Sequence, residues 1–173
     1  MNKGIFIREE VFKDRPFIYS VHRRAFHRED EAILVDKLRN SAAYIPELSL
    51  VAYNESNTLT GHVLFTRLEL EGHNGLELLA LAPMAVLPKF QRTGVGSELV
   101  REGLIRAGEL GYSGVIVLGH AKYYPRFGFV PASKFVIKSP FKVPDDVFMA
   151  LELKKGILTN KRGVVKYPRE FSE

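Results

Sequence analysis

No cysteine occurs among the 173 residues of this chain. Disulfide bonds, a thiolate nucleophile and zinc sites built from cysteine are therefore excluded. The sequence also lacks any segment near the about 18 apolar residues that a membrane-spanning helix needs, and its start, Met1 to Glu10, is too charged for a signal peptide. We therefore expect a cytoplasmic protein that does not associate with membranes.

The charge is mildly positive and is spread along the chain. Lys and Arg number 25 against 20 Asp and Glu, a net charge of +5, but no basic run is longer than a pair such as Arg23-Arg24. This pattern favours a solvated surface, so nucleic-acid binding is a minor hypothesis. With 46% hydrophobic and 26% charged residues, the chain has a globular composition at the size of one domain, which predicts a single domain over residues 1–173.

The N-terminal quarter predicts one strand and two helices. Residues 5–11 alternate weakly between apolar and polar side chains, as a strand does. Apolar residues recur at helical spacing from Pro16 to Phe26 and again from Glu29 to Arg39. The second helix has acidic residues first and basic residues last, which suits the helix dipole.

Strand patterns dominate the rest of the chain. Three apolar runs joined by short turns predict an antiparallel meander: residues 48–53, 61–70 and 76–87. The continuous apolar run 115–118 predicts a strand that is covered on both faces, and a further strand is expected over 148–153.

A long helix is predicted over residues 94–110, before the strand at 115–118. Gly103 and Gly108 would let this helix lie close to the sheet, and Gly111 would cap its end. The strand before the helix, the helix and the strand after it form a βαβ unit. The fold class is therefore α/β with a mixed sheet.

The junction between the third strand and this helix contains Gly94 and Gly96. Residues without side chains allow a phosphate to approach the backbone, and the free N–H groups of the first helical turn point toward it with the positive end of the helix dipole. A pyrophosphate fits such a site. The alternative is that both glycines only permit a tight turn and close packing of the helix.

Two other phosphate-binding loops do not match this junction. A Walker loop would place Gly-Lys-Ser/Thr at its end, whereas Gly96 is followed by Ser97. A dinucleotide-binding loop would have a third glycine where Leu99 stands, and an acidic residue at the end of the next strand.

The segment Gln91–Gly96 resembles Gln/Arg-x-x-Gly-x-Gly/Ala, the coenzyme A pyrophosphate signature of the GNAT superfamily. A second motif, Tyr124–Phe129, resembles the Tyr-x-x-x-Gly-Phe near the end of that domain. Several runs are similar to the YhbS-like subgroup of bacterial N-acetyltransferases: Gly61-His62, Leu118–His120 and Tyr123–Pro131.

This resemblance implies a GNAT-like fold, with a mixed, largely antiparallel sheet of about seven strands flanked by helices and a βαβ core that binds coenzyme A. The core would span about residues 48–153, with the N-terminal helices, 12–45, on the acceptor side and a C-terminal tail at 154–173. It also implies acetyl-CoA as the acyl donor, without a metal.

The resemblance assigns the cofactor site position by position. The backbone N–H groups around the pyrophosphate would be those of Arg92, Thr93, Gly94, Val95, Gly96 and Ser97. Gln91 would order the loop, and the main chain of Val86 would hold the pantetheine arm. The amide of Met84 would polarise the thioester carbonyl as an oxyanion donor.

Acetyl transfer also needs proton donors and acceptors. By resemblance Tyr124 is the general acid for the departing thiolate, although it could instead be an aromatic core residue with a satisfied hydroxyl. Some family members carry a glutamate as base, but Ala80 stands at that position. The identity of the base remains open: it could be Glu77, His120 or an ordered water relay, or the substrate could arrive neutral. For His120 a structural or substrate-lining role is favoured over catalysis.

The remaining histidines show no spacing with carboxylates that would indicate a metal site: His22, His27, His62 and His73. The sequence therefore predicts an N-acetyltransferase that transfers the acetyl group of acetyl-CoA to a primary amine by direct attack in a ternary complex. The acceptor would be a small molecule or a peptide, and a homodimer is compatible with the sequence. The alternative is a non-catalytic module that binds or senses acyl-CoA.

Overall fold

The computed structural model describes residues 4–173. Residues 1–3, which belong to the stretch where we expect no signal peptide, lie outside the described residues. The chain packs into two compact units: unit 1 holds the described residues up to Phe65 together with Pro83–Arg106, and unit 2 holds Thr66–Ala82 and Ala107–Glu173. The single domain over residues 1–173 stays a prediction.

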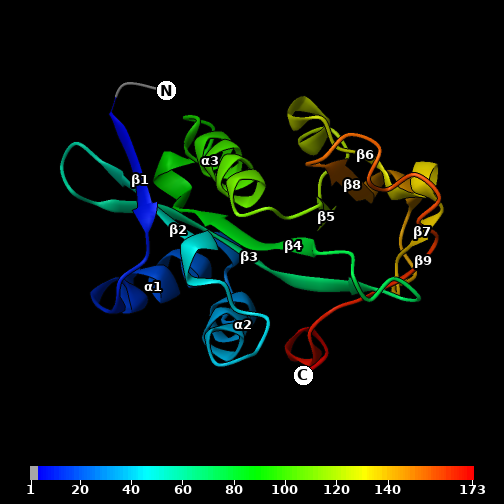
Figure 1. Cartoon of the computed structure of the whole chain (residues 1–173). Helices are drawn as coiled ribbons and strands as arrows, with labels where there is room; N and C mark the ends of the chain where they lie inside the picture. Colours follow the sequence, from blue (N-terminus) through cyan, green and yellow to red (C-terminus); the bar gives the residue numbers. More distant parts are fainter. Residues whose placement is uncertain (1–3) are drawn as a thin grey trace. The chain divides into compact units, whose positions relative to one another are not determined.

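Unit 1 consists of antiparallel strands with helices on both faces (Figure 1). The strand order is β1-β2-β3-β4, where the strands are β1 (Ile5–Glu9), β2 (Ser49–Asn54), the first part of β3 (Leu59–Leu70) and the last part of β4 (Leu78–Val86). Helices α1 (Arg15–Phe26) and α2 (Asp30–Arg39) lie on one face, and α3 (Val95–Glu109) begins on the other. These elements confirm the predicted N-terminal strand, the helices and the meander within a few residues.

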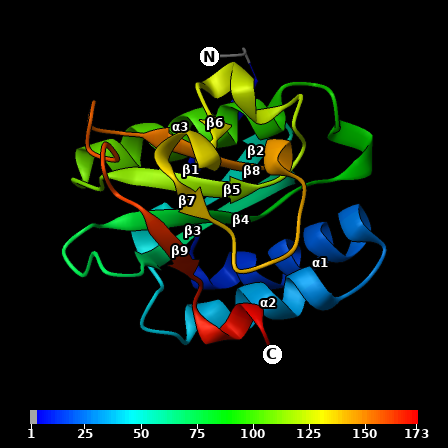
Figure 2. The ribbon, with the colours of Figure 1, turned by 90° about the vertical axis from the view of Figure 1, so that its right-hand side faces the viewer.

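Unit 2 continues from β4 in the order β4-β5-β8-β6. Strand β5 (Gly114–Leu118) runs parallel to β4, and β8 (Phe148–Glu152) runs antiparallel to β5. Three short strands complete the unit. β6 (Val130–Pro131) pairs with β8. β7 (Ile137–Lys138) pairs with β9 (Gly163–Lys166), and β9 also pairs with the end of β3 (Figure 2).

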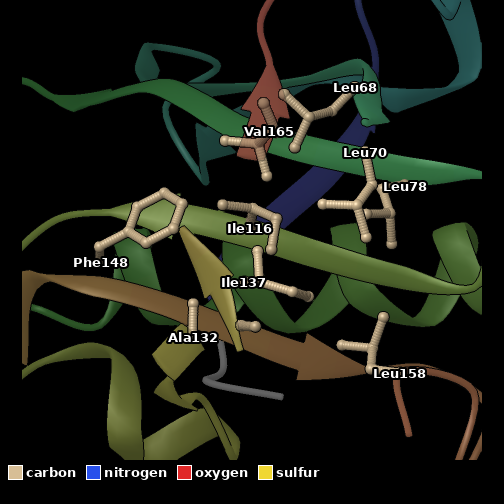
Figure 3. Packing of buried hydrophobic residues seen from close by; sticks show 11 residues of the cluster. Leu68, Leu70, Leu78, Ile116, Ala132, Ile137, Phe148, Leu158 and Val165 are labelled. Atoms are coloured by element: carbon tan, nitrogen blue, oxygen red, sulfur yellow. The ribbon is translucent and has the colours of Figure 1, made fainter. Parts of the chain in front are cut away.

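A hydrophobic cluster forms the centre of unit 2 (Figure 3). Most of its large members come from strands that are far apart in the sequence: Leu68, Leu70, Leu78, Ile116, Ile137, Phe148 and Val165. Burial of these side chains, at roughly 1.5–3 kcal/mol each, provides the main stabilisation of the unit.

The predicted fold class is confirmed, because the structure is a mixed, mostly antiparallel sheet with helices. The strands β6, β7 and β9 were not expected, so residues 4–173 contain nine strands instead of about seven. β6 and β7 have two residues each and β9 has four, so they show little or no period in the sequence. No helix in the described part of the chain has the length and apolar character that are needed to cross a membrane.

Helix α3 ends in a Schellman motif. Gly111 has a φ of +90° and donates to Gly108, while Tyr112 donates to Ala107 over 3.1 Å. Gly103 is the point of close approach to the sheet, because a Cβ there would lie 2.2 Å from the Phe65 ring. The expectation for Gly108 was wrong, since a Cβ at that position would meet nothing within 4 Å.

The two glycines therefore predict opposite effects of the same substitution. Gly103→Ala should destabilise the protein by about 1–3 kcal/mol, because the new methyl group overpacks the Phe65 contact. Gly108→Ala should leave stability unchanged or raise it by up to about 1 kcal/mol, because alanine favours the helix. Urea unfolding of both variants measures the difference, and equal effects would contradict the close approach at Gly103.

Candidate functional site

The turn between β4 and α3 is exposed and is held by its own side chains. After Val86 the chain forms a short 3-10 helix at Pro88–Phe90, and residues 91–93 are exposed. Gln91 donates from Nε2 to the carbonyl of Val86 over 3.1 Å, and Thr93 donates from Oγ1 to the carbonyl of Phe90 over 2.6 Å. The turn thus keeps its shape through side-chain donors.

The first N–H groups of α3 follow this turn, at the N-terminus of the helix. The first backbone bond of the helix runs from Glu98 N to the carbonyl of Gly94 over 3.0 Å, so Gly94 is the N-cap. The N–H groups of Val95 and Gly96 lie before that bond and have no acceptor within the helix. With the positive end of the helix dipole behind them, they are able to donate to an anion.

Two positive φ angles shape the turn, +63° at Arg92 and +97° at Gly94. The exposed side chains of Lys89 and Arg92 add positive charge. Glu98, the acidic residue in the first turn of the helix, is paired with Arg101 over 3.1 Å. A negatively charged group is therefore favoured at this turn.

Strand β3 packs closely against the first turn of α3. A Cβ on Gly61 would lie 2.9 Å from the side chain of Val95 and 3.0 Å from that of Leu99. Only glycine allows the helix to start this close to the strand. The sequence contained no pattern that identified this role, because the contact joins residues more than thirty positions apart.

The last part of β4 exposes one edge of its backbone. Leu87 donates to the carbonyl of Thr60 over 2.9 Å, so its N–H points to β3. Since N–H groups alternate along a strand, those of Met84 and Val86 point to the opposite edge. The ladder to β5 covers only the residues from Leu78 to Ala80. Met84 and Val86 lie beyond this ladder, and both are half-buried.

Tyr124 belongs to unit 2 and begins the short 3-10 helix Tyr124–Phe127. Its ring is buried and makes edge contacts with Tyr123 and Phe129, at centroid distances of 5.1 and 5.7 Å. Burial, and then the neighbouring Tyr123, raise the pKa of the Tyr124 phenol above its ordinary range. No described residue accepts a hydrogen bond from the hydroxyl, and this oxygen is not sealed from solvent.

The candidates for the base also lie in unit 2. His120 and Glu77 have exposed side chains, and the contacts that the structure gives them are through their carbonyls, which accept from Tyr123 and Ser113. Ala80 is buried and pairs with Ile116. Nothing within residues 4–173 groups three or more His, Cys, Asp or Glu side chains as a metal would require.

A buried polar network in unit 1 was not predicted. His22 of α1 contacts His62 of β3, Nε2 to Nδ1, over 2.9 Å, and Nε2 of His62 lies 2.9 Å from the Ser49 hydroxyl. Ser49 donates to the Glu10 carboxylate over 2.6 Å. Arg39 donates twice to the same carboxylate, over 2.7 and 3.0 Å. The residues of this network come from five separate segments of the chain, so no sequence motif could reveal the network.

Sequence comparison identifies relatives over most of the chain. A model of the acetyltransferase (GNAT) domain matches residues 46–131. The uncharacterized N-acetyltransferase YjhQ of Escherichia coli K12 is 41% identical over 135 residues, 77% of this chain and 74% of YjhQ. The uncharacterized N-acetyltransferase YhbS of the same strain is 32% identical over 168 residues, 97% of this chain and 99% of YhbS.

Solved structures agree with the sequence relatives. The crystal structure of YhbS from Escherichia coli in complex with CoA has a TM-score of 0.91 at 31% identity, and the match covers 98% of this chain and 93% of that one. A GNAT family acetyltransferase from Brucella melitensis in complex with acetyl-CoA has a TM-score of 0.77 at 30% identity, with 96% and 97% covered. The chain therefore belongs to the GNAT family of acetyltransferases, together with YhbS and YjhQ.

Proposed function

We propose that this protein transfers the acetyl group of acetyl-CoA to a primary amine by direct attack in a ternary complex. The observation that carries the proposal is the exposed turn at the start of α3, whose N–H groups at Val95 and Gly96 have no acceptor within the helix. The turn would bind the pyrophosphate through the backbone of residues 92–97. The relatives solved with CoA and acetyl-CoA support this choice of ligand.

Within this proposal, the exposed edge of β4 binds the rest of the cofactor. The main chain of Val86 would hold the pantetheine arm, while Gln91 keeps the turn in place through its bond to the Val86 carbonyl. The N–H of Met84 would donate to the thioester oxygen. An oriented amide of this kind stabilises the negative charge that develops on that oxygen during attack.

Tyr124 is the proposed general acid. Its raised pKa keeps the phenol protonated at neutral pH, and its hydroxyl has no protein acceptor among the described residues, so its proton is available to the thiolate of coenzyme A. For His120 we propose at most a role beside the substrate. The acceptor is a small-molecule or peptide amine, and the protein is proposed to act in the cytoplasm.

One observation favours the alternative of a non-catalytic acyl-CoA-binding module. Ala80 belongs to the hydrophobic cluster of unit 2, so the position where some relatives carry a carboxylate is apolar here. The two functions differ in turnover. Release of free thiol from acetyl-CoA in the presence of a panel of amines supports the transferase, whereas tight binding without release supports the sensing module.

Replacement of Gly94 tests the cofactor turn. Gly94→Val should weaken acetyl-CoA binding by at least about 100-fold, because valine disfavours the φ of +97° and the turn loses several charge-assisted hydrogen bonds. Isothermal titration calorimetry measures the affinity. Gly72→Val is the matched control, since Gly72 also has a positive φ, +78°, and a Cβ there meets nothing within 4 Å. Equal weakening in both variants would argue against a phosphate role for the turn.

Replacement of Tyr124 tests the general acid. Tyr124→Phe should lower kcat by about 100-fold and leave the affinity for acetyl-CoA intact, because the ring keeps its packing and only the proton donor is lost. Tyr167→Phe is the control, since burial raises the pKa of Tyr167 to about 12 but the residue has no proposed role. A Tyr124→Phe variant that loses affinity and turnover alike would show that the tyrosine is only structural.

A further inference from the structure

A hollow of about 510 Å³ in unit 1 is lined by helix α1 and by the hairpin that joins β2 and β3. Its volume falls within the roughly 300–1,000 Å³ that is usual for small-molecule sites. Helix α1 contributes Phe17, Val21 and Arg24, which share one face because they are spaced by four and three residues. Leu59 of β3 and Leu87, which follows β4, add apolar surface. The hollow therefore has the size and the apolar lining of a ligand site.

The acidic side chain at this hollow has no capacity left for a cation. Of the described residues that line the hollow, only Asp14 is acidic, and it is buried. Its Oδ1 accepts from Arg8 over 3.0 Å and from the Tyr53 hydroxyl over 2.7 Å. Its Oδ2 accepts from Arg8 over 2.6 Å and from the N–H of Val11 over 2.8 Å. Because a carboxylate has about four acceptor sites, the protein itself saturates Asp14.

Two basic side chains at the hollow are without a partner in the protein. Lys13 and Arg24 line the hollow and are exposed, and within residues 4–173 neither makes an ion pair or a side-chain hydrogen bond. The neighbouring arginine of α1 differs, since Arg23 lies 3.5 Å from Glu29. With its acidic group already balanced, the hollow carries an excess of positive charge, which favours an anion.

The hollow also presents groups that a ligand could cover. Phe17 is 61% exposed, although it is a large apolar side chain on the wall. At the hairpin, Asn57 adopts a φ of +54°, and its amide side chain makes no hydrogen bond with the described part of the chain. A ligand with an apolar body would remove the Phe17 ring from water, which is favourable. A polar atom on the same ligand could bond to the Asn57 amide.

We propose that this hollow binds a small organic acid, which consists of a carboxylate on an aromatic or aliphatic body. The body would lie against Phe17, Leu59 and Leu87. The carboxylate would pair with Arg24, whose planar guanidinium can donate two parallel hydrogen bonds, and Lys13 would add positive charge. The stripe from Phe17 to Arg24 is about 10 Å long, so a short acid can span it.

The proposed acid site is separate from the turn that would bind coenzyme A. Among the lining residues that the structure describes, none belongs to residues 88–97. An acid in the hollow should therefore bind whether or not coenzyme A is present. The inference goes beyond the proposed transfer reaction and does not depend on it.

Three probes that share one body and differ in charge test the preference: phenylbutyrate, phenylbutyramide and phenylbutylamine. In nitrogen-15 NMR titrations the acid should shift the N–H signals of Val21, Leu59 and Leu87. The neutral amide should bind at least about tenfold more weakly than the acid, and the amine should not bind detectably. Saturating coenzyme A should change the affinity for the acid by less than about twofold. Equal affinity for acid and amide, or displacement of the acid by coenzyme A, would overturn the proposal.

Two adjacent arginines provide a matched pair of variants. Arg24→Gln should weaken the binding of phenylbutyrate by about tenfold, because glutamine lacks the positive charge. Arg23→Gln is the control and should keep the affinity, since Arg23 pairs with Glu29 and does not line the hollow. Both side chains are exposed, so both variants should fold, and thermal unfolding checks this.

Equal weakening by the two variants would contradict the acid site. An acetylated acidic tetrapeptide that binds more tightly than phenylbutyrate would also contradict it and would assign the hollow to a peptide. Either result leaves the transferase function standing, because release of thiol with the amine panel tests that function separately.

Discussion

The start of helix α3 is the constraint on which the proposed chemistry depends. A helix cannot satisfy its first N–H groups internally, and here those of Val95 and Gly96 come shortly after the exposed residues 91–93. The turn keeps its shape because Gln91 and Thr93 bond to nearby carbonyls. The backbone amides are therefore available for an anion instead of being used to fold the loop.

Strand β3 connects this turn with the buried network in unit 1. Neighbouring residues of a strand point to opposite faces, so Gly61 faces α3 while His62 faces α1. Gly61 allows the helix to start close to the strand, and His62 is held by hydrogen bonds to His22 and Ser49. One short stretch of strand thus supports the proposed cofactor turn on one side and the buried polar network on the other.

The sequence predicted the features that depend on local patterns. The spacing of apolar residues identified α3 and the meander, and the glycines at 94 and 96 marked the turn, because helix periods and turn residues are visible in short windows. Contacts between distant segments were not visible. Gly61 against Val95, the five-segment network around His62, and the pairing of β9 with β3 depend on tertiary packing. Gly108 was misjudged for another reason, since it is exposed and lies off the apolar stripe of α3.

The central claim is that backbone amides at the start of α3 bind the pyrophosphate of the cofactor. An amide-resolved nitrogen-15 NMR titration with coenzyme A tests it most directly. The account predicts that the N–H signals of Gly94, Val95 and Gly96 shift strongly downfield as they acquire phosphate acceptors, and that inorganic pyrophosphate shifts the same signals at higher concentration. Saturating coenzyme A that leaves these three signals in place would contradict the account.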